Sequence, residues 1–353
     1  CMLTTVTLEK LLRVAIGKSA SDLHLSVGLP PAARIYGEIV TLPFDNLAPE
    51  VCQDLIYSIL NPEQIERFEK DWELDFSMAL PGIGRFRVNV FREKGFVECS
   101  LRIVASEIKT LEELGLPEAV IELSRRPNGM VLVTGPTGVG KTTTFNSLID
   151  QINRERRCRV VTIEDPIEYV HKHKKSVILQ RELHSDTHSF AIALRHVLRQ
   201  DPDIIGIGEM RDLETISTAI TAAETGHLVI ATLHTSDAQQ TIDRIVDVFP
   251  PHQQEQIRTQ LANSLQGIIS QQLLPTVERT GRVIAYELLI ATPAIRRLIR
   301  ENKNTQLDTF IQTGSEFGMV SMDHSLKTLY QQGRISFDVA MSKVKNPQAF
   351  KDL

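Results

Sequence analysis

The chain has 353 residues, which is long enough to bury two hydrophobic cores. Its 42% hydrophobic and 24% charged residues are typical of a soluble globular protein and exclude disordered and fibrous classes. The chain has 44 acidic residues and 39 lysines and arginines. The resulting net charge of −5 argues against non-specific binding of nucleic acid through overall charge.

The four cysteines are dispersed without a CxxC pair, so we expect no metal site among them and reduced, cytosolic thiols. No apolar stretch has the length that spans a bilayer, and no signal-peptide pattern opens the sequence. Cys1 precedes Met2, and we interpret it as a residue added ahead of the natural start rather than as a lipoprotein cysteine. A cytoplasmic protein is the expectation.

Residues 1–104 predict a small α+β domain with an antiparallel sheet. In its strand-like stretches apolar and polar residues alternate, as around Leu23, Leu25 and Val27, which is the pattern of a sheet with one wet face. The expected elements are a helix at 8–16, strands at 21–28 and 33–42, helices at 49–60 and 62–70, and strands at 72–80, 84–93 and 96–104.

A polar segment at 105–117 predicts a linker, and residues 118–353 predict a second domain. After a short helix, apolar runs rich in branched residues alternate with helical patterns, which indicates a mainly parallel sheet covered on both faces. The strands are expected at 130–134, 159–165, 176–182, 203–209 and 227–234, with helices at 140–153, 188–200 and 212–225. Beyond residue 236 the pattern is largely helical, apart from a strand at 282–290.

The stretch GPTGVGKT at 135–142 satisfies GxxxxGK[ST] between a predicted strand and a predicted helix. In such a loop the main-chain N–H groups converge on a phosphate, the lysine reaches the β- and γ-phosphates, and the last hydroxyl binds Mg²⁺. We therefore predict a site for ATP with Mg²⁺. Its residues are Gly135, Pro136, Thr137, Gly138, Val139, Gly140, Lys141, Thr142 and Thr143.

Hydrolysis requires a group that orients or deprotonates water beside the γ-phosphate, and two acidic strand ends are candidates. Glu164 ends the run VVTIE and Glu209 ends the run DIIGIGE, and ligands of open α/β sheets sit at the carboxyl ends of the strands. We predict Glu209 as the catalytic carboxylate, with Glu164 supporting the water or, together with Thr142, the metal. The alternative for either acid is a solvated residue at a strand end.

Two histidines and three arginines are further candidates. His234 closes the strand HLVIATLH, so it is either a γ-phosphate sensor or a satisfied core histidine, and His227 opens the same strand as the weaker candidate for nucleotide contact. Arg85, Arg87 and Arg92 occupy one strand of the N-terminal domain. Their spacing alone favours an ordinary charged face, and the functional alternative is a finger toward the phosphate of a neighbouring subunit.

Four motifs in this order resemble the Walker A, Asp box, Walker B and His box of the secretion-ATPase superfamily. They stand here as GPTGVGKT, TIEDPIEYVH, DPDIIGIGEMRD and TGHLVIATLHTSDA. SDLHLSVGLPPAARIYGEI is similar to the superfamily's PAS-like domain, and GRFRVNVFRE to its arginine strand, which implies a nucleotide contact by Arg85, Arg87 and Arg92 at a subunit boundary. ATPAIRRLIRENK is similar to the AIRNLIRE signature of type IV pilus retraction ATPases, the PilT family, with Arg297 in place of the usual asparagine.

The resemblance implies an α/β fold with a RecA-like P-loop NTPase core, an N-terminal α+β PAS-like domain and C-terminal helices. It also implies a cytoplasmic homohexamer at the inner face of the cytoplasmic membrane. Hydrolysis of ATP would move one subunit's N-terminal domain against the next subunit's core, act on an inner-membrane platform protein and retract the pilus. The membrane contact is made through that partner, and no direct contact with nucleic acid is implied.

Other functions stay open at the level of sequence. Pilus extension ATPases, type II and conjugation-type secretion ATPases and a second retraction paralogue share the same core motifs. A nucleic-acid translocase is disfavoured by the acidic charge and by the lack of an aromatic and basic stripe. A small-molecule kinase is disfavoured because amphipathic helices, rather than a lid and an acceptor pocket, follow the His box.

Overall fold

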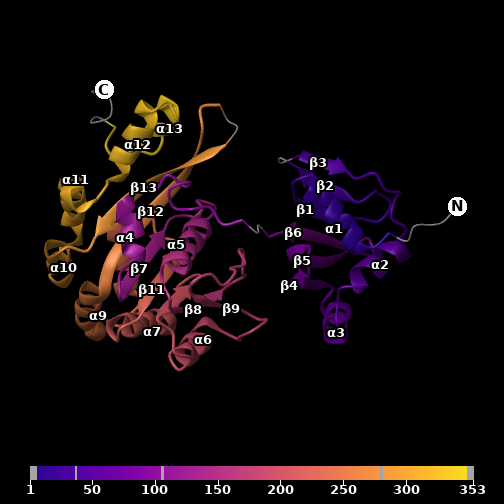
Figure 1. Cartoon of the computed structure of the whole chain (residues 1–353), viewed down its shortest axis with the longest axis horizontal. Coiled ribbons are helices and arrows are strands. Elements are labelled where there is room, and N and C mark those ends of the chain that lie inside the picture. The colour runs from indigo at the N-terminus through magenta and orange to yellow at the C-terminus, as the bar shows by residue number, and fades with distance from the viewer. Residues whose placement is uncertain (1–5, 36–37, 105–106, 279–280, 348–353) are drawn as a thin grey trace. The chain divides into compact units, whose positions relative to one another are not determined.

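The structure is a computed structural model, and it describes residues 6–35, 38–104, 107–278 and 281–347 (Figure 1). Cys1 therefore lies outside the described residues. The chain divides after residue 107 into two compact units, with residues 168–170 grouped with the first. Each unit contains a sheet of its own.

The first unit is built on a six-stranded sheet in the order β3-β2-β1-β6-β5-β4, and every neighbouring pair is antiparallel. Its elements are α1 (Leu8–Gly17), β1 (Ala20–Leu25), β2 (Ala32–Ile35), β3 (Glu38–Thr41), α2 (Pro49–Tyr57), α3 (Pro62–Asp71), β4 (Glu73–Leu80), β5 (Gly84–Glu93) and β6 (Phe96–Ile103). The expected antiparallel sheet is confirmed. The single strand expected at 33–42 is wrong, because β2 and β3 pair with each other there, on either side of residues 36–37, which lie outside the described residues.

Local sequence explains how these elements form. The Thr7 hydroxyl caps α1 by accepting a hydrogen bond from the helix's first turn, and four apolar residues of α1 share one buried face. In β5 the buried Phe86, Val88 and Val90 alternate with more exposed residues such as Arg87. The period of two therefore directs one face of this strand into the core of the first unit.

The second unit contains a seven-stranded sheet in the order β13-β12-β7-β11-β10-β8-β9. Its strands are β7 (Gly129–Thr134), β8 (Arg159–Glu164), β9 (Val177–Glu182), β10 (Ile204–Ile207), β11 (Leu228–Leu233), β12 (Leu265–Pro275) and β13 (Arg282–Ile290). Neighbouring strands are parallel except for β12 and β13, which confirms the expected mainly parallel sheet. Its main helices are α4 (Glu118–Ser124), α5 (Lys141–Glu155), α6 (Phe190–Val197), α7 (Leu213–Glu224), α8 (Ala238–Asp247), α9 (Pro251–Ser264), α10 (Pro293–Arg300), α11 (Leu307–Thr313), α12 (Met322–Gln331) and α13 (Phe337–Met341).

Strand β7 is buried on both faces of the sheet. Met130 and Leu132 pack with residues of α6, α7 and α9, whereas Val131 and Val133 pack with residues of α4 and α5. Successive side chains of a strand point to opposite faces, so a continuous apolar run is needed here. The carboxyl end of β7 is therefore held firmly between two helical layers, and the glycine-rich loop begins at that point.

Strand β12 differs from the expectation, because the pattern after residue 236 predicted helices there. Its run LQGIISQQLLP contains Ser270, Gln271 and Gln272, which interrupt the apolar signal. Ser270 and Gln271 are nevertheless fully buried, because their side chains hydrogen-bond to Thr134 and to the main chain of Val139. Buried polar residues that serve a long-range contact look like surface residues in the sequence.

Residues 108–117, which fall in the segment expected as a linker, belong to the second unit. Leu111 and Leu116 are buried there in the core beside α4 and α5. Residues 105–106 lie outside the described part of the chain. Among the helices that the structure describes, none combines the length and apolarity needed to cross a bilayer.

Candidate nucleotide site

The loop between β7 and α5 has a backbone that requires glycine. Gly135, Gly138 and Gly140 have φ angles of 144°, 83° and 89°, a region that other residues rarely adopt. At Gly135 a Cβ would lie 2.5 Å from the main-chain oxygen of Gln271 on β12. The loop therefore bends tightly against the sheet, and its residues 136–138 are exposed.

Lys141 is the first residue of α5, and it is only 8% exposed. Its Nζ donates hydrogen bonds to the main-chain oxygens of Gly135 (2.8 Å) and Pro136 (2.9 Å). Burial lowers the pKa of Lys141, and the negative charge of Glu209 opposes that shift. A buried ammonium held by neutral carbonyls is poorly compensated, so an anion bound in this loop would be stabilised.

The amino end of α5 adds to this preference for anions. Its first main-chain N–H groups lack partners within the helix, and the helix dipole gives them partial positive charge. Thr142 and Thr143 follow Lys141 in the first turn, and both are partly buried. The bent loop, the ammonium and the helix terminus together fit a phosphate chain, and the Thr142 hydroxyl is an available ligand for a Mg²⁺ bound to it.

Glu209 lies just beyond the carboxyl end of β10, and its side chain is 20% exposed. Oε2 lies 2.7 Å from Arg211 Nη2, and Oε1 lies 3.0 Å from His234 Nε2. Burial alone would raise the pKa of Glu209, but the hydrogen bond from Arg211 and the charge of the His234 ring hold it below its ordinary value. Glu209 is therefore ionised at neutral pH.

His234 connects this carboxylate to the glycine-rich loop. A carboxylate can only accept hydrogen bonds, so His234 Nε2 carries a proton toward Glu209. The other ring nitrogen, Nδ1, lies 3.3 Å from the Thr137 hydroxyl. The structure thus brings Glu209, His234 and the loop together at one edge of the sheet.

Glu164 is the last residue of β8, and it is 2% exposed. Its Oε1 accepts hydrogen bonds from the Thr162 hydroxyl (2.7 Å) and from Gln180 Nε2 (3.0 Å). Gly208 permits the next strand end to lie close, because a Cβ there would be 3.1 Å from the Glu164 Cα. A larger residue at position 208 would push the two acidic strand ends apart.

His227 is not brought to the loop of its own chain. It precedes β11, and its main-chain oxygen accepts a hydrogen bond from Gly129 N–H (3.0 Å) at the amino edge of the parallel strands. Its Nδ1 lies 3.1 Å from the main-chain oxygen of Ala222. Because β11 has six residues, about 20 Å of strand separates His227 from His234. Within one chain, His227 therefore lies away from the glycine-rich loop, and its contact with nucleotide stays a prediction.

The three arginines of β5 belong to the first unit and do not share one face. Arg85 and Arg87 lie on the side away from the core-facing residues of the strand, and Arg87 is exposed. Arg92 lies on the other side, where its Nη2 is 2.5 Å from Glu69 Oε2 and its guanidinium lies 5.7 and 5.9 Å from the centres of two aromatic rings. Arg92 is thus engaged within its own unit.

Reasoning from the sequence missed residues that support the loop. Gln271 is fully buried, and its Nε2 donates a hydrogen bond to the main-chain oxygen of Val139 (2.8 Å), 132 residues away in the chain. No local pattern marks such a pair. Arg211 could have been found, because it stands two residues after Glu209 and is the nearest cation in the motif.

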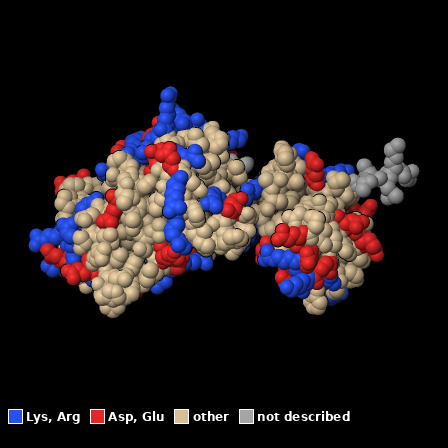
Figure 2. Space-filling model, turned by 90° about the horizontal axis from the view of Figure 1, so that it is seen from below, with Lys and Arg blue, Asp and Glu red and all other residues tan. Residues whose placement is uncertain are grey.

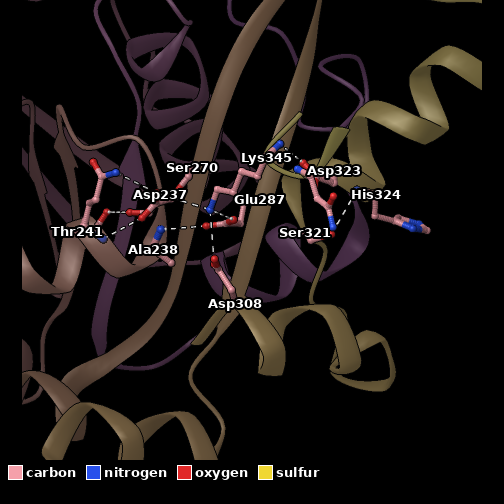
Figure 3. Close-up of polar contacts among 12 residues, drawn as sticks. Asp237, Ala238, Thr241, Ser270, Glu287, Asp308, Ser321, Asp323, His324 and Lys345 are labelled. Carbon is pink, nitrogen blue, oxygen red and sulfur yellow. Dashed lines mark hydrogen bonds and ion pairs between the residues drawn. The ribbon is translucent and has the colours of Figure 1, made fainter. Parts of the chain in front are cut away.

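The segment that follows β11 is anchored by charged groups (Figure 3). Asp237 caps α8, and Glu287 of β13 accepts a hydrogen bond from the first N–H of that helix (2.9 Å). Lys345 Nζ lies 3.4 to 3.6 Å from carboxylate oxygens, which belong to Glu287, Asp308 and Asp237. One ammonium therefore ties the C-terminal segment to the helix that follows the His box.

Together, the parallel sheet and the glycine-rich loop at its carboxyl edge, with a buried lysine opening the next helix, define a P-loop nucleotide-binding protein. Similarity to known proteins narrows this class. The sequence pattern of the type II/IV secretion system protein family matches residues 77–337, so the chain belongs to that family.

Similar proteins cover nearly the whole chain. The type IV pilus retraction ATPase PilT of Pseudomonas aeruginosa is 48% identical over 343 residues, which are 97% of this chain and 99% of that protein. The type IV pilus ATPase PilU of the same organism is 39% identical over 334 residues, 95% of this chain and 87% of its own. The crystal structure of the pilus retraction motor PilT with bound ADP aligns with a TM-score of 0.92 at 50% identity, over 99% of this chain and 100% of that one. The chain shares that fold, with an N-terminal α+β domain, a RecA-like core and C-terminal helices.

Proposed function

We propose that the protein is a motor ATPase that hydrolyses ATP with Mg²⁺ to power retraction of type IV pili. The observation that carries the proposal is a buried lysine ammonium in a glycine-rich loop, Lys141, placed beside an ionised carboxylate, Glu209. The 48% identity to a retraction ATPase over 97% of the chain supports the mechanical role. The ADP bound in the similar motor structure supports adenine nucleotide as the ligand.

The residues of the site divide the chemistry among them. The loop N–H groups and Lys141 bind the phosphate chain and compensate the charge of the γ-phosphate in the transition state. Thr142 and Glu164 would hold a Mg²⁺ ion, which when bound would supply positive charge against the phosphates. Glu209 orients the attacking water and accepts its proton, for which its ionised state at neutral pH is required.

His234 couples the presence of a γ-phosphate in the site to the position of the helix that follows it. It already bridges Glu209 and Thr137, so a γ-phosphate that enters the loop can compete for its ring N–H. His234 is followed within a few residues by α8, whose first turn is tied to the C-terminal segment through Glu287 and Lys345. Loss of the γ-phosphate can thus bias the position of a whole helix.

The working form in this proposal is a homohexamer, in which arginines of one subunit reach the phosphates of the next. The exposure of Arg87 supports a role at a subunit boundary, with Arg85 on the same side of β5. Arg92 would have to break its ion pair with Glu69 before it could reach the same phosphates. The two units then move against one another around the segment that joins them, as a motor requires.

The proposed partner is an inner-membrane platform protein, which would keep the motor at the cytoplasmic face of the membrane. On the face shown in Figure 2, lysines and arginines lie among aspartates and glutamates rather than in one basic tract. With a net charge of −5, this distribution favours a protein partner over direct contact with nucleic acid.

Deletion of the gene in the parent organism, followed by pilus counting, tests the proposal. Surplus pili that fail to retract are the expected result, and complementation with the wild-type chain should restore retraction whereas Lys141→Ala should not. Absence of pili after deletion would instead indicate an assembly ATPase.

A further inference from the structure

His171 ends the Asp-box segment and is 7% exposed, yet the mechanism above does not use it. Its main-chain N–H donates a hydrogen bond to Gln180 Oε1 (2.8 Å). Its ring Nε2 lies 2.8 Å from Asn146 Oδ1. His171 therefore contacts two side-chain amides, one on α5 and the other on β9.

The amide of Asn146 connects His171 to the first turn of α5. Asn146 is fully buried, and its Nδ2 donates a hydrogen bond to the main-chain oxygen of Thr142 (2.9 Å). Because Nδ2 must face that oxygen, Oδ1 faces His171, and the ring Nε2 must carry the proton. Burial lowers the pKa of His171 to about 4, so the ring is neutral at physiological pH and its single proton is the one on Nε2.

The amide of Gln180 connects His171 to the acidic end of β8. Its Oε1 accepts from the main chain of His171, so its Nε2 faces Glu164 and donates to Oε1 of that carboxylate (3.0 Å). Each amide has its orientation fixed at both ends. Turning either one over would bring two oxygens, or two N–H groups, face to face.

We infer that His171 is a positioning residue, which holds Thr142 and Glu164 in register by orienting the two amides that contact them. The inference rests on the nucleotide site proposed above. Without the ring N–H, Asn146 Oδ1 loses its donor in a fully buried position, and the orientation of the amide is fixed only at the Thr142 end. The restraint on the main chain of Thr142, whose hydroxyl is a proposed Mg²⁺ ligand, is then weaker.

His171→Leu removes the ring donor and leaves the main-chain donor to Gln180 in place. We expect ADP affinity in the presence of Mg²⁺, measured by calorimetry, to fall roughly tenfold, the effect of one buried hydrogen bond. ADP affinity in EDTA should not change, which a general loss of structure would not allow. His171→Gln supplies an amide N–H within reach of Asn146 and should restore most of the affinity. His252→Leu, at an exposed histidine of α9, is the matched control.

The other arm of the arrangement is tested through Gln180. Gln180→Leu should also lower the affinity for ADP in the presence of Mg²⁺ but not in EDTA, because its amide contacts Glu164, the other proposed Mg²⁺ ligand. If His171→Leu fails to fold, His171→Asn, whose amide is too short to reach Asn146, takes its place with the same expectations. A wild-type ratio of affinities with and without Mg²⁺ in these His171 variants would overturn the inference. Failure of the wild-type chain to bind Mg²⁺ and ADP would overturn the proposed function as well.

Discussion

Arg296 of α10 should stabilise the second unit far more than the arginine beside it, although the two look alike in the sequence. Its Nη1 donates hydrogen bonds to the main-chain oxygens of Ala262 (2.5 Å) and Asn263 (2.6 Å), and its Nε donates to Ala291 (3.1 Å). Ala262 and Asn263 lie in the last turn of α9, and that turn contains no basic residue. Arg296 thus supplies the cation that the end of another helix lacks.

The magnitude follows from these contacts. Arg296→Ala removes three hydrogen bonds to a charged group, each worth about 1.5–3 kcal/mol, and a cation at a helix terminus worth about 0.3–1 kcal/mol. The side chain is only half-buried, so water replaces part of what is lost. We expect the free energy of unfolding to fall by about 2–3 kcal/mol, or Tm by roughly 4–12 °C for a unit of this size.

Thermal and urea unfolding of the purified chain measure this effect, with Arg297→Ala as a control on the same helix. The Arg297 side chain is 73% exposed and pairs with Glu301 at the surface, where solvent screens the attraction, so we expect Arg297→Ala to change stability little. If Arg296→Ala lowers stability no more than Arg297→Ala does, Arg296 does not act as a helix cap.

Three further results are expected. Arg297→Ala combined with Arg300→Ala should leave basal ATP turnover intact but abolish pilus retraction in cells, because both side chains are exposed and suit contact with a partner. Glu209→Gln should still bind ATP and lower kcat about 10²–10⁴-fold, measured as phosphate release. Lys345→Ala should lower the free energy of unfolding by about 1–3 kcal/mol at pH 8. The loss should be smaller at pH 5. Burial raises the pKa of Glu287, so more of this carboxyl is protonated there, and a neutral carboxyl is not stabilised by the charge of Lys345.

Each of these expectations has an outcome that contradicts it. Normal retraction by the double arginine variant would remove the coupling role of α10. Full activity of Glu209→Gln beside an inactive Glu164→Gln would reverse the roles of the two acids. Lys343→Ala is the control for Lys345, since Lys343 is exposed two residues earlier. An equal effect of both lysine variants, or one that is independent of pH, would argue against the Glu287 contact.

The sequence predicted the parts of the fold that depend on local pattern. The apolar run of β7, the glycine spacing after it and the helix that opens at Lys141 are consecutive in the chain, so each supports the others. The alternation in β5 and β6 likewise predicted their antiparallel pairing. In these segments the residues that decide the structure lie within one turn or strand of each other.

The rest depended on contacts between distant segments. The sequence does not predict β12, because the polar Gln271 interrupts its apolar run and is explained only by its hydrogen bond to the main chain of Val139. Arg296 resembles a surface residue in the sequence, because the α9 carbonyls that it caps lie more than 30 residues earlier. His227 and His234 open and close the same strand in the sequence, and the direction of β11 places them at opposite edges of the sheet. The role of His171 depends on Asn146 and Gln180, and neither belongs to a motif.

The central claim is that the Lys141 ammonium holds the terminal phosphate of ATP for hydrolysis, and turnover by the purified chain tests it most directly. Phosphate release should be measured side by side for the wild type and Lys141→Ala, with circular dichroism to show that both are folded. The account predicts steady release by the wild type and none above background by the variant. Equal release by the two folded proteins would contradict it.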